Sequence, residues 1–437
     1  MSNERPPGLL SRIAKAAAKV EANELGATSL SFLFVFLSMA AYFLLRPARD
    51  SMAGDWTQEE VSWLWTATFF FSVLAVILYG GIISRVRFSR VVPGVYLFFA
   101  LTFIAFWAGA RLLPDPESSN QVFYVWLSVF SLFHLSVFWS FMSGVFNREQ
   151  APRLFAPIAT GASLGAMVGP TLPTFFIDDI GTLNLLPVSA GLLLLTIPII
   201  LRLQTLKETA LGNPDLVADL ADAKRLGRNP FSGFMLFVKN PYLLGIGVFI
   251  LFYVTMSTFI YMELRNELGE FDRDTRTQIY GAMDLIVNSL TFVVGFFVTG
   301  RLATRFGMAA TLALIPALMV GGWLIVAAVP LLVVLAGLQI SRRIGNYSVT
   351  RPGREMLFTV VDEETRYKAK PVIDIVLYRG GDMLTAWLYA ALTATLGLGL
   401  AGVATLAAGI AAVWAFVGIY LGRAYRDHDN ASASPEK

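Results

Sequence analysis

The sequence predicts an all-α, polytopic membrane protein with about twelve transmembrane helices, arranged as two six-helix repeats. The 437 residues are 56% hydrophobic and 15% charged, with a mean hydropathy of +0.62. Soluble chains average about 45–50% apolar and about 25% charged residues. Long apolar stretches recur along the chain, and similar turns occur at corresponding places in its two halves. This composition excludes a soluble enzyme, a disordered chain and an outer-membrane barrel.

The apolar stretches are each about as long as a transmembrane helix, which takes roughly 20 residues. A polar insert follows the sixth stretch. The first stretch follows a long leader that contains Glu4, Glu21 and Glu24, so we interpret it as an uncleaved helix and not as a signal peptide. The stretches cover about 28–48, 61–83, 91–112, 122–146, 153–177, 183–201, 241–263, 277–300, 308–328, 331–350, 371–396 and 399–422.

Lys and Arg gather in alternate loops, and this asymmetry predicts which side each loop faces. Both termini and the insert are expected in the cytoplasm of a bacterial cell (inner) membrane. The leader carries apolar residues at near-helical spacing, which suits either a surface helix or an unstructured tail. The expected parts are a cytoplasmic N-terminal segment (1–27), a six-helix half (28–202), a cytoplasmic linker (203–240), a second half (241–422) and a cytoplasmic tail (423–437).

Two kinds of turn occur once in each half, as expected of an internal repeat. Gly80 precedes Arg85 by five residues, and Gly300 precedes Arg305 by five. Acid-and-Arg turns follow the fourth and tenth stretches. The basic residues expected in these cytoplasmic gate turns are Arg85, Arg153, Arg305 and Arg366.

Charged residues inside membrane helices are costly and mark pathways or sites. The cations within the stretches are all Arg, which binds phosphate or carboxylate through two parallel hydrogen bonds. They outnumber the acids, so we expect a cavity that selects an anion. The cations are Arg46, Arg49, Arg342, Arg343, Arg351, Arg354 and Arg379, and the acids are Asp50, Asp284, Glu355, Asp374 and Asp382. Residues expected to pair helices or to couple transport are Asp284, Asn288, Arg342 and Asp374.

The turn from Gly300 to Gly307 resembles the G-x-x-x-D-R-x-G-R pattern of the major facilitator superfamily, with Thr304 in place of Asp. The Arg-rich segments also resemble the ATP/ADP translocase (nucleotide transporter) family and its free-living bacterial relatives. That family's first helix carries Y-x-x-L-R-x-x-K-D-[ST], which here is Tyr42 to Ser51 with Arg49 in place of Lys. The resemblance implies a major-facilitator-like fold. It also implies substrate contacts from Arg46, Arg49, Asp50, Tyr347, Arg354, Glu355, Arg379 and Asp382.

One departure from that family concerns the seventh helix. The family's nucleotide exchangers carry a Glu there, in an N-x-x-E setting. This chain has no acid between Tyr253 and Phe259, and the first one is Glu263.

We therefore expect a secondary active transporter that moves an organic anion by alternating access. The anion would bear phosphate, with ATP and ADP as candidates. Membrane lipids are expected partners, nucleic acid polymers are not, and the oligomeric state stays open. The absence of Cys and the presence of two His, His134 and His428, leave no basis for a metal site, a cofactor or an enzyme.

Other functions stay open. A proton-coupled porter of another organic anion or a drug would titrate Asp284, Asp374 or Asp382. A membrane enzyme acting on lipid phosphates would need a cluster of His, Asp or Lys at a membrane face, which the sequence lacks. A non-transporting membrane partner would not need the matched Arg residues.

Overall fold

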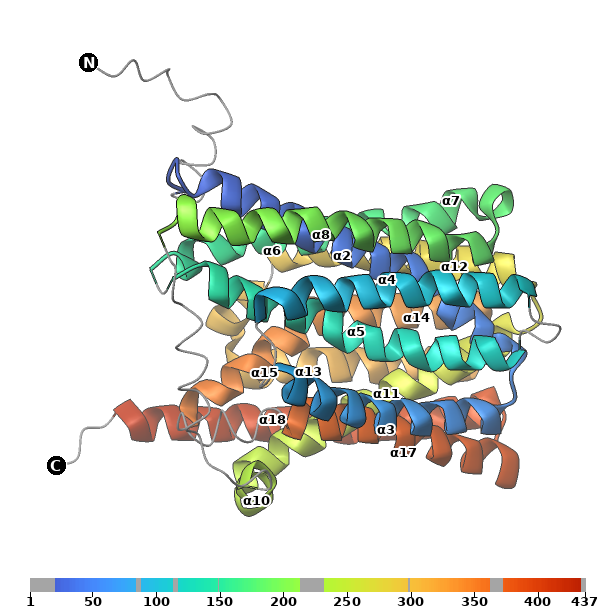
Figure 1. The fold of residues 1–437 in the computed structure, drawn as a ribbon. Helices are drawn as coiled ribbons and strands as arrows, with labels where there is room; N and C mark the ends of the chain where they lie inside the picture. The colour runs from blue at the N-terminus through green and yellow to red at the C-terminus, as the bar shows by residue number, and fades with distance from the viewer. Residues whose placement is uncertain are drawn as a thin grey trace, which may run out of the picture. The chain divides into compact units, whose positions relative to one another are not determined.

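The computed structural model describes residues 20–83, 88–112, 117–147, 149–212, 232–297, 299–361 and 372–433. These residues form helices and no strand, which confirms the all-α prediction (Figure 1). In the first half of the chain the elements are α2 (Leu25–Met52), η1 (Ala53–Asp55), α3 (Gln58–Ile83), α4 (Phe88–Leu112), α5 (Glu117–Val145), α6 (Ala151–Val168), α7 (Thr171–Ile180), η2 (Thr182–Asn184) and α8 (Leu185–Thr209).

In the second half they are α10 (Ser232–Lys239), α11 (Pro241–Leu268), α12 (Arg273–Phe297), α13 (Thr299–Ala328), α14 (Leu332–Gly345), η4 (Asn346–Thr350), α15 (Arg351–Leu357), η5 (Phe358–Val360), η6 (Val372–Leu377), α17 (Tyr378–Ala390), η7 (Ala391–Thr395) and α18 (Leu400–Ala433). One helix, or one run of consecutive helices, corresponds to each predicted apolar stretch. The short helix α10 is additional and lies in the predicted linker.

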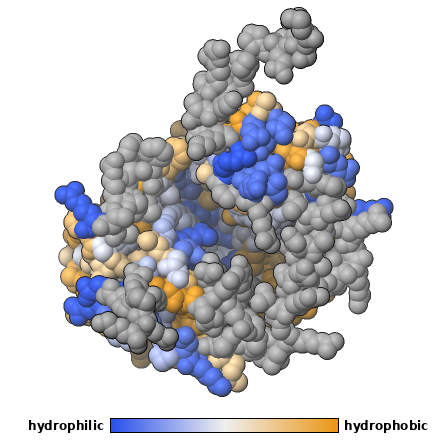
Figure 2. Space-filling view, turned by 90° about the vertical axis from the view of Figure 1, so that its left-hand side faces the viewer, coloured by the Kyte–Doolittle hydropathy of each residue, from blue (hydrophilic) through white to orange (hydrophobic). Residues whose placement is uncertain are grey.

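Nine helices in the described part of the chain are long and apolar enough to cross a membrane. Helix α12 is not among these nine. The helices α14 and α17 are too short, since π-helical turns interrupt both runs. Figure 2 looks onto one end of the helices, where hydrophilic side chains gather, while hydrophobic ones lie along the flanks. The chain is therefore a multi-pass membrane protein.

The helices form two compact units. Unit 1 comprises 1–49, 74–225 and 277–285, and unit 2 comprises 50–73, 226–276 and 286–437. The start of α3 thus belongs to unit 2, and a middle segment of α12 belongs to unit 1. In unit 1, α4 packs extensively along α8, and in unit 2, α13 packs along α18. These are the third and sixth stretches and the ninth and twelfth, so equivalent pairs pack in both halves, as expected of a repeat.

Glycines bring α6 into close contact with the backbone of α2, and α18 into close contact with the backbone of α13. On α6, Gly161 and Gly165 face α2 at a spacing of four residues. A Cβ atom on Gly165 would lie 2.3 Å from the carbonyl oxygen of Phe36. On α18, a Cβ atom on Gly422 would lie 2.2 Å from the Cα atom of Ala309. Membrane helices commonly pack through such small residues because apolar burial does not drive their association.

Replacing Gly165 with Val is expected to lower the thermal unfolding temperature strongly, because the added isopropyl group would push α6 away from α2. Overpacked sites cost typically 1–3 kcal/mol. The measurement is thermal unfolding of the purified protein in detergent. Gly191→Val on α8 is the matched control, since no atom lies within 4 Å of the position a Cβ would take there. Equal melting temperatures for the two variants would contradict the close contact.

Several sequence predictions lie outside the described residues. These concern the first 19 residues of the N-terminal segment, most of the linker (213–231), the end of the tail (434–437) and two of the four gate residues, Arg85 and Arg366. The division of the chain into sequence halves stays a prediction.

Candidate functional site

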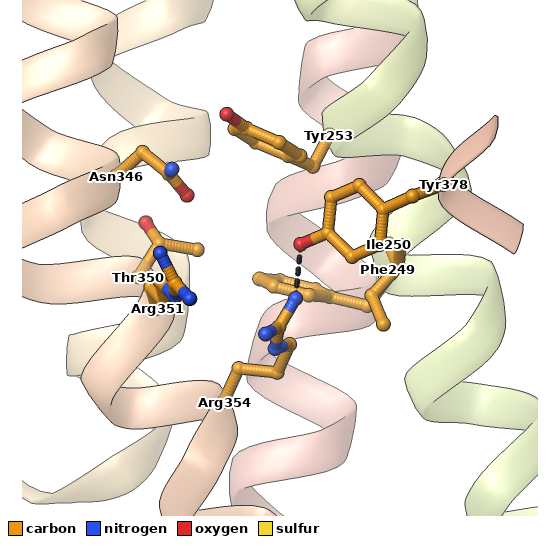
Figure 3. Close-up of a pocket in the computed structure, with 8 residues that line it drawn as sticks. All are labelled: Phe249, Ile250, Tyr253, Asn346, Thr350, Arg351, Arg354 and Tyr378. Carbon is orange, nitrogen blue, oxygen red and sulfur yellow. Dashed lines mark hydrogen bonds between the residues drawn. The ribbon is translucent and has the colours of Figure 1, made fainter. Parts of the chain in front are cut away.

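A pocket with an empty volume of about 180 Å³ lies in unit 2. The helix α11 contributes Phe249, Ile250 and Tyr253, and α17 contributes its first residue, Tyr378. The other lining residues are Asn346 and Thr350 from η4 and Arg351 and Arg354 from α15. Figure 3 shows the rings of the two tyrosines facing the amide, hydroxyl and guanidinium groups across the pocket.

The local backbone explains why these residues meet. The element η4 is a π-helix between α14 and α15, and a second π-helix, η6, ends immediately before Tyr378. A π-helical turn is wider than an α-helical turn, and such turns occur often at functional sites. The wide turn places Asn346, Thr350 and Arg354 along one face, where they line the pocket together.

Arg354 is the buried cation of the pocket, with 5% of its surface exposed. Its Nη1 donates a hydrogen bond to the hydroxyl of Tyr378, and its Cζ lies 5.3 Å from the centre of that ring. Its Nη2 lies 2.8 Å from Oε1 of Glu355, which does not line the pocket. The ring of Tyr253 lies 6.1 Å from the ring of Tyr378 at 64°.

A second buried arginine, Arg342, forms a hydrogen bond with Tyr253. Arg342 donates from Nη1 to the Tyr253 hydroxyl at 3.1 Å and from Nη2 to Oε1 of Gln339 at 2.8 Å. No carboxylate of the described residues pairs with Arg342, which is 4% exposed. Its positive charge therefore adds to the field at the pocket and is not cancelled by a described acid.

Two lining groups have polar atoms that the described residues leave without a partner. The Oγ1 atom of Thr350 is buried and accepts or donates no hydrogen bond within the described chain. Arg351 is exposed, and no described carboxylate forms an ion pair with it. Among the described residues, the lining holds two guanidinium groups and no carboxylate. Chemically, the pocket can bind an anion and stack a planar ring beside it.

The first-helix arginines lie in unit 1, each with its own partners. Arg46 forms an ion pair with Asp284 on α12, with 3.4 Å between Nη1 and Oδ1. Arg49 lies 5.4 Å from the ring centre of Tyr124 and donates to Oγ of Ser128 at 3.3 Å. Helix pairing by Asp284, one of the two roles expected for it, is thus present in the structure.

The remaining predicted residues are placed as follows. Asp50 is buried at the end of α2, and Tyr347 is half-buried in η4 but does not line the pocket. Arg379 and Asp382 lie 4.0 Å apart on α17, outside the pocket lining. Asn288 is half-buried on α12, and Asp374 lies in η6 with its side chain outside the described set. Of the two described gate residues, Arg153 forms hydrogen bonds with Glu24, and Arg305 is exposed with its guanidinium group near the ring of Phe306.

Sequence reasoning missed several lining residues. Thr350 and Phe249 carry no charge and belong to no repeated pattern, so nothing in the sequence singled them out. The π-helical turn that aligns Asn346 with Arg354 leaves no mark in residue spacing. The two tyrosines were not missed: Tyr253 and Tyr378 lie inside apolar stretches, and from the sequence they could stack on a planar ring or on an Arg.

The fold defines a multi-pass helical membrane protein with a polar, arginine-lined pocket in unit 2. A family model described as the Major Facilitator Superfamily matches residues 31–346, more than half of the chain. The chain therefore belongs to the Major Facilitator Superfamily. No curated protein matches the sequence.

Two solved transporters show the same fold. A bacterial homologue of the human lysosomal transporter Spinster, in an inward-facing, unoccupied conformation, aligns with a TM-score of 0.58 at 11% identity, over 94% of this chain and 99% of that chain. The nucleoside transporter NupG aligns with a TM-score of 0.60 at 13% identity, over 92% of this chain and 99% of that chain. At these identities the likeness shows the fold alone.

Proposed function

We propose that the chain is a secondary active transporter of a phosphate-bearing organic anion, and that a nucleotide such as ATP or ADP is the first candidate. The observation that carries the proposal is the pocket lining, which among the described residues has two arginines, three aromatic rings and no carboxylate. The narrower membership in the ATP/ADP translocase family is part of this proposal. So are the bacterial inner membrane and the cytoplasmic termini.

The choice of arginine supports phosphate as the bound group. Arg keeps its charge when buried and offers parallel N–H donors that match phosphate oxygens. Arg354 already donates to Tyr378 and Glu355, so a ligand phosphate would take the place of one of these partners. Arg351 has no described partner to give up, and Thr350 adds a hydroxyl donor.

The space that the lining residues enclose is small, with an empty volume of about 180 Å³ that includes open solvent. We therefore expect the pocket to contact one end of a nucleotide. Tyr253 and Tyr378 are placed to contact a ring, and Arg351 and Arg354 to contact a phosphate. NupG is named a nucleoside transporter, which makes nucleosides an informative comparison for the binding test.

The experiment is ligand-induced thermal stabilisation of the purified protein. The panel comprises ATP, ADP, adenosine, inorganic phosphate, sugar phosphates, dicarboxylates and cationic drugs. A ligand present at 100 times its Kd stabilises the folded state by about 2.7 kcal/mol, so we expect a clear rise in melting temperature with ATP or ADP. Stabilisation by sugar phosphates but not by nucleotides would retain the anion and reject the nucleotide. Stabilisation by dicarboxylates, adenosine or cationic drugs alone would contradict the phosphate-binding proposal.

A further inference from the structure

A carboxyl group that the pocket does not use lies buried inside α11. Glu263 is 4% exposed and lies five residues before the helix ends at Leu268. It is ten residues beyond Tyr253, which corresponds to about 15 Å along a helix that rises 1.5 Å per residue. Ionisable groups at such positions in membrane helices are rare and usually have a function.

A chain of hydrogen bonds leads to this carboxyl group. The hydroxyl of Tyr389, on α17, is hydrogen-bonded to the Glu263 carboxyl. The same hydroxyl accepts a hydrogen bond from Nδ2 of Asn266 at 3.0 Å. Asn266 in turn accepts one from Nη2 of Arg265 at 2.8 Å. The other carboxyl oxygen of Glu263, Oε1, is buried and has no hydrogen-bond partner among the described residues.

The charged groups around Glu263 do not compensate a negative charge on it. Arg265, on the same helix, turns toward Asn266 and the carbonyl oxygen of Thr57, and it faces Glu60 of α3. Glu267, one turn further along α11, is another acid. No described cation forms an ion pair with Glu263. A buried carboxylate without a cation is very costly, so this environment favours the neutral, protonated form of the group.

The first turns of α3 cover this region within unit 2. Ser62 donates to the carbonyl oxygen of Ala386, one turn before Tyr389 on α17, at 3.3 Å. Trp387 donates to Oγ1 of Thr66 at 3.0 Å. Gln58 contacts the sulfur of Met262, next to Glu263, at 3.5 Å. The start of α3 thus packs against α11 and α17 beside Glu263.

We propose that Glu263 is a proton-binding site inside the membrane, and that loss of its proton is linked to opening of the contact between α3 and α17. The proton passes from the Glu263 carboxyl to water when the contact opens, and a proton from water neutralises the carboxylate before it closes. Such a linkage would couple a proton gradient to transport. The coupling rests on the proposed transport function, but both tests below work without a substrate.

The first test asks whether Glu263 carries a proton. Infrared spectra of the full-length protein in lipid vesicles at neutral pH are expected to contain the carbonyl stretch of a protonated carboxyl group, which Glu263→Gln removes. Tyr389→Phe is expected to raise the frequency of this band, because it removes the hydrogen bond from the hydroxyl. Glu270→Gln changes an exposed acid and is the matched control. If the spectrum of Glu263→Gln equals that of the wild type, the proposal is wrong.

The second test asks whether the proton controls the contact. The chain has no Cys, so a single introduced thiol can be followed alone. Ser62→Cys places this thiol in the buried contact with α17, and Glu270→Cys provides an exposed reference for the intrinsic effect of pH on labelling. Labelling by a maleimide, relative to the reference, is expected to rise between acidic and alkaline pH by up to about tenfold per pH unit, the limit for one linked proton. Adding Glu263→Gln should hold labelling at the low, acidic level, and an unchanged pH response in that variant would overturn the proposal.

Discussion

Arg354→Ala is expected to weaken binding of the phosphate-bearing ligand by about tenfold or more. A charge-assisted hydrogen bond contributes about 1.5–3 kcal/mol, and about 1.4 kcal/mol corresponds to a factor of ten in Kd. Arg354 is the buried cation of the pocket and donates a hydrogen bond to Tyr378. Its loss therefore removes both the positive charge and the parallel N–H donors that would bind the phosphate. The measurement is the ligand concentration that gives half-maximal thermal stabilisation.

Two further variants separate the effect of the positive charge from the effect of the parallel hydrogen-bond donors. Arg354→Lys keeps the charge and loses the second parallel donor, so we expect an intermediate affinity. Arg423→Ala removes the same charge from an exposed position on α18 and is expected to leave binding unchanged. Melting temperatures without ligand show whether each variant folds. An Arg354→Ala protein that folds and binds the ligand with wild-type affinity would place the phosphate site elsewhere.

The second large effect is expected in unit 1. Arg46→Gln should destabilise the protein by about 3 kcal/mol, because it removes the cation that pairs with Asp284. Breaking a buried ion pair by removing one partner costs about 3–5 kcal/mol. The lower value applies because the Arg46 side chain is 17% exposed, whereas that of Asp284 is 4% exposed.

The measurement for this pair is thermal or denaturant unfolding in detergent. The exchange of both residues, Arg46→Asp with Asp284→Arg, is expected to recover part of the loss because the two charges again face each other. Arg202→Gln on α8 removes an exposed Arg and is the control. An exchanged variant less stable than either single variant would show that the pair does not stabilise unit 1 through its charges.

Much of the fold could be predicted from the sequence, because the bilayer imposes a simple rule. Each apolar stretch must form a helix that satisfies its own backbone hydrogen bonds, so the order of α2 to α18 follows from hydropathy. The repeat was visible in the turns at Arg85 and Arg305. In the structure, the same repeat appears as two equivalent helix pairs, α4 with α8 in the first half and α13 with α18 in the second.

The site could be predicted only in part. The apolar stretches revealed a surplus of arginines over acids among their charged residues, and Arg354 does lie in the pocket. The partners could not be derived, since the contact between Arg46 and Asp284 joins residues 238 positions apart. Hydropathy also does not reveal a π-helical turn, and this turn selects Asn346 and Thr350 as lining residues while Tyr347 does not line the pocket.

The glycine contacts and the π-helical turns have a mechanical consequence for unit 2. The helices α13 and α18 touch backbone to backbone at Gly418 and Gly422, so the part of α13 beyond its kink at Gly307 is held closely against α18. The run from α14 to α15 and the run from η6 to η7 lack this reinforcement and change their helical pitch along their length. Bending would therefore concentrate in those two runs. Because Asn346, Arg354 and Tyr378 lie on them, a small bend would change the spacing of the residues that line the pocket.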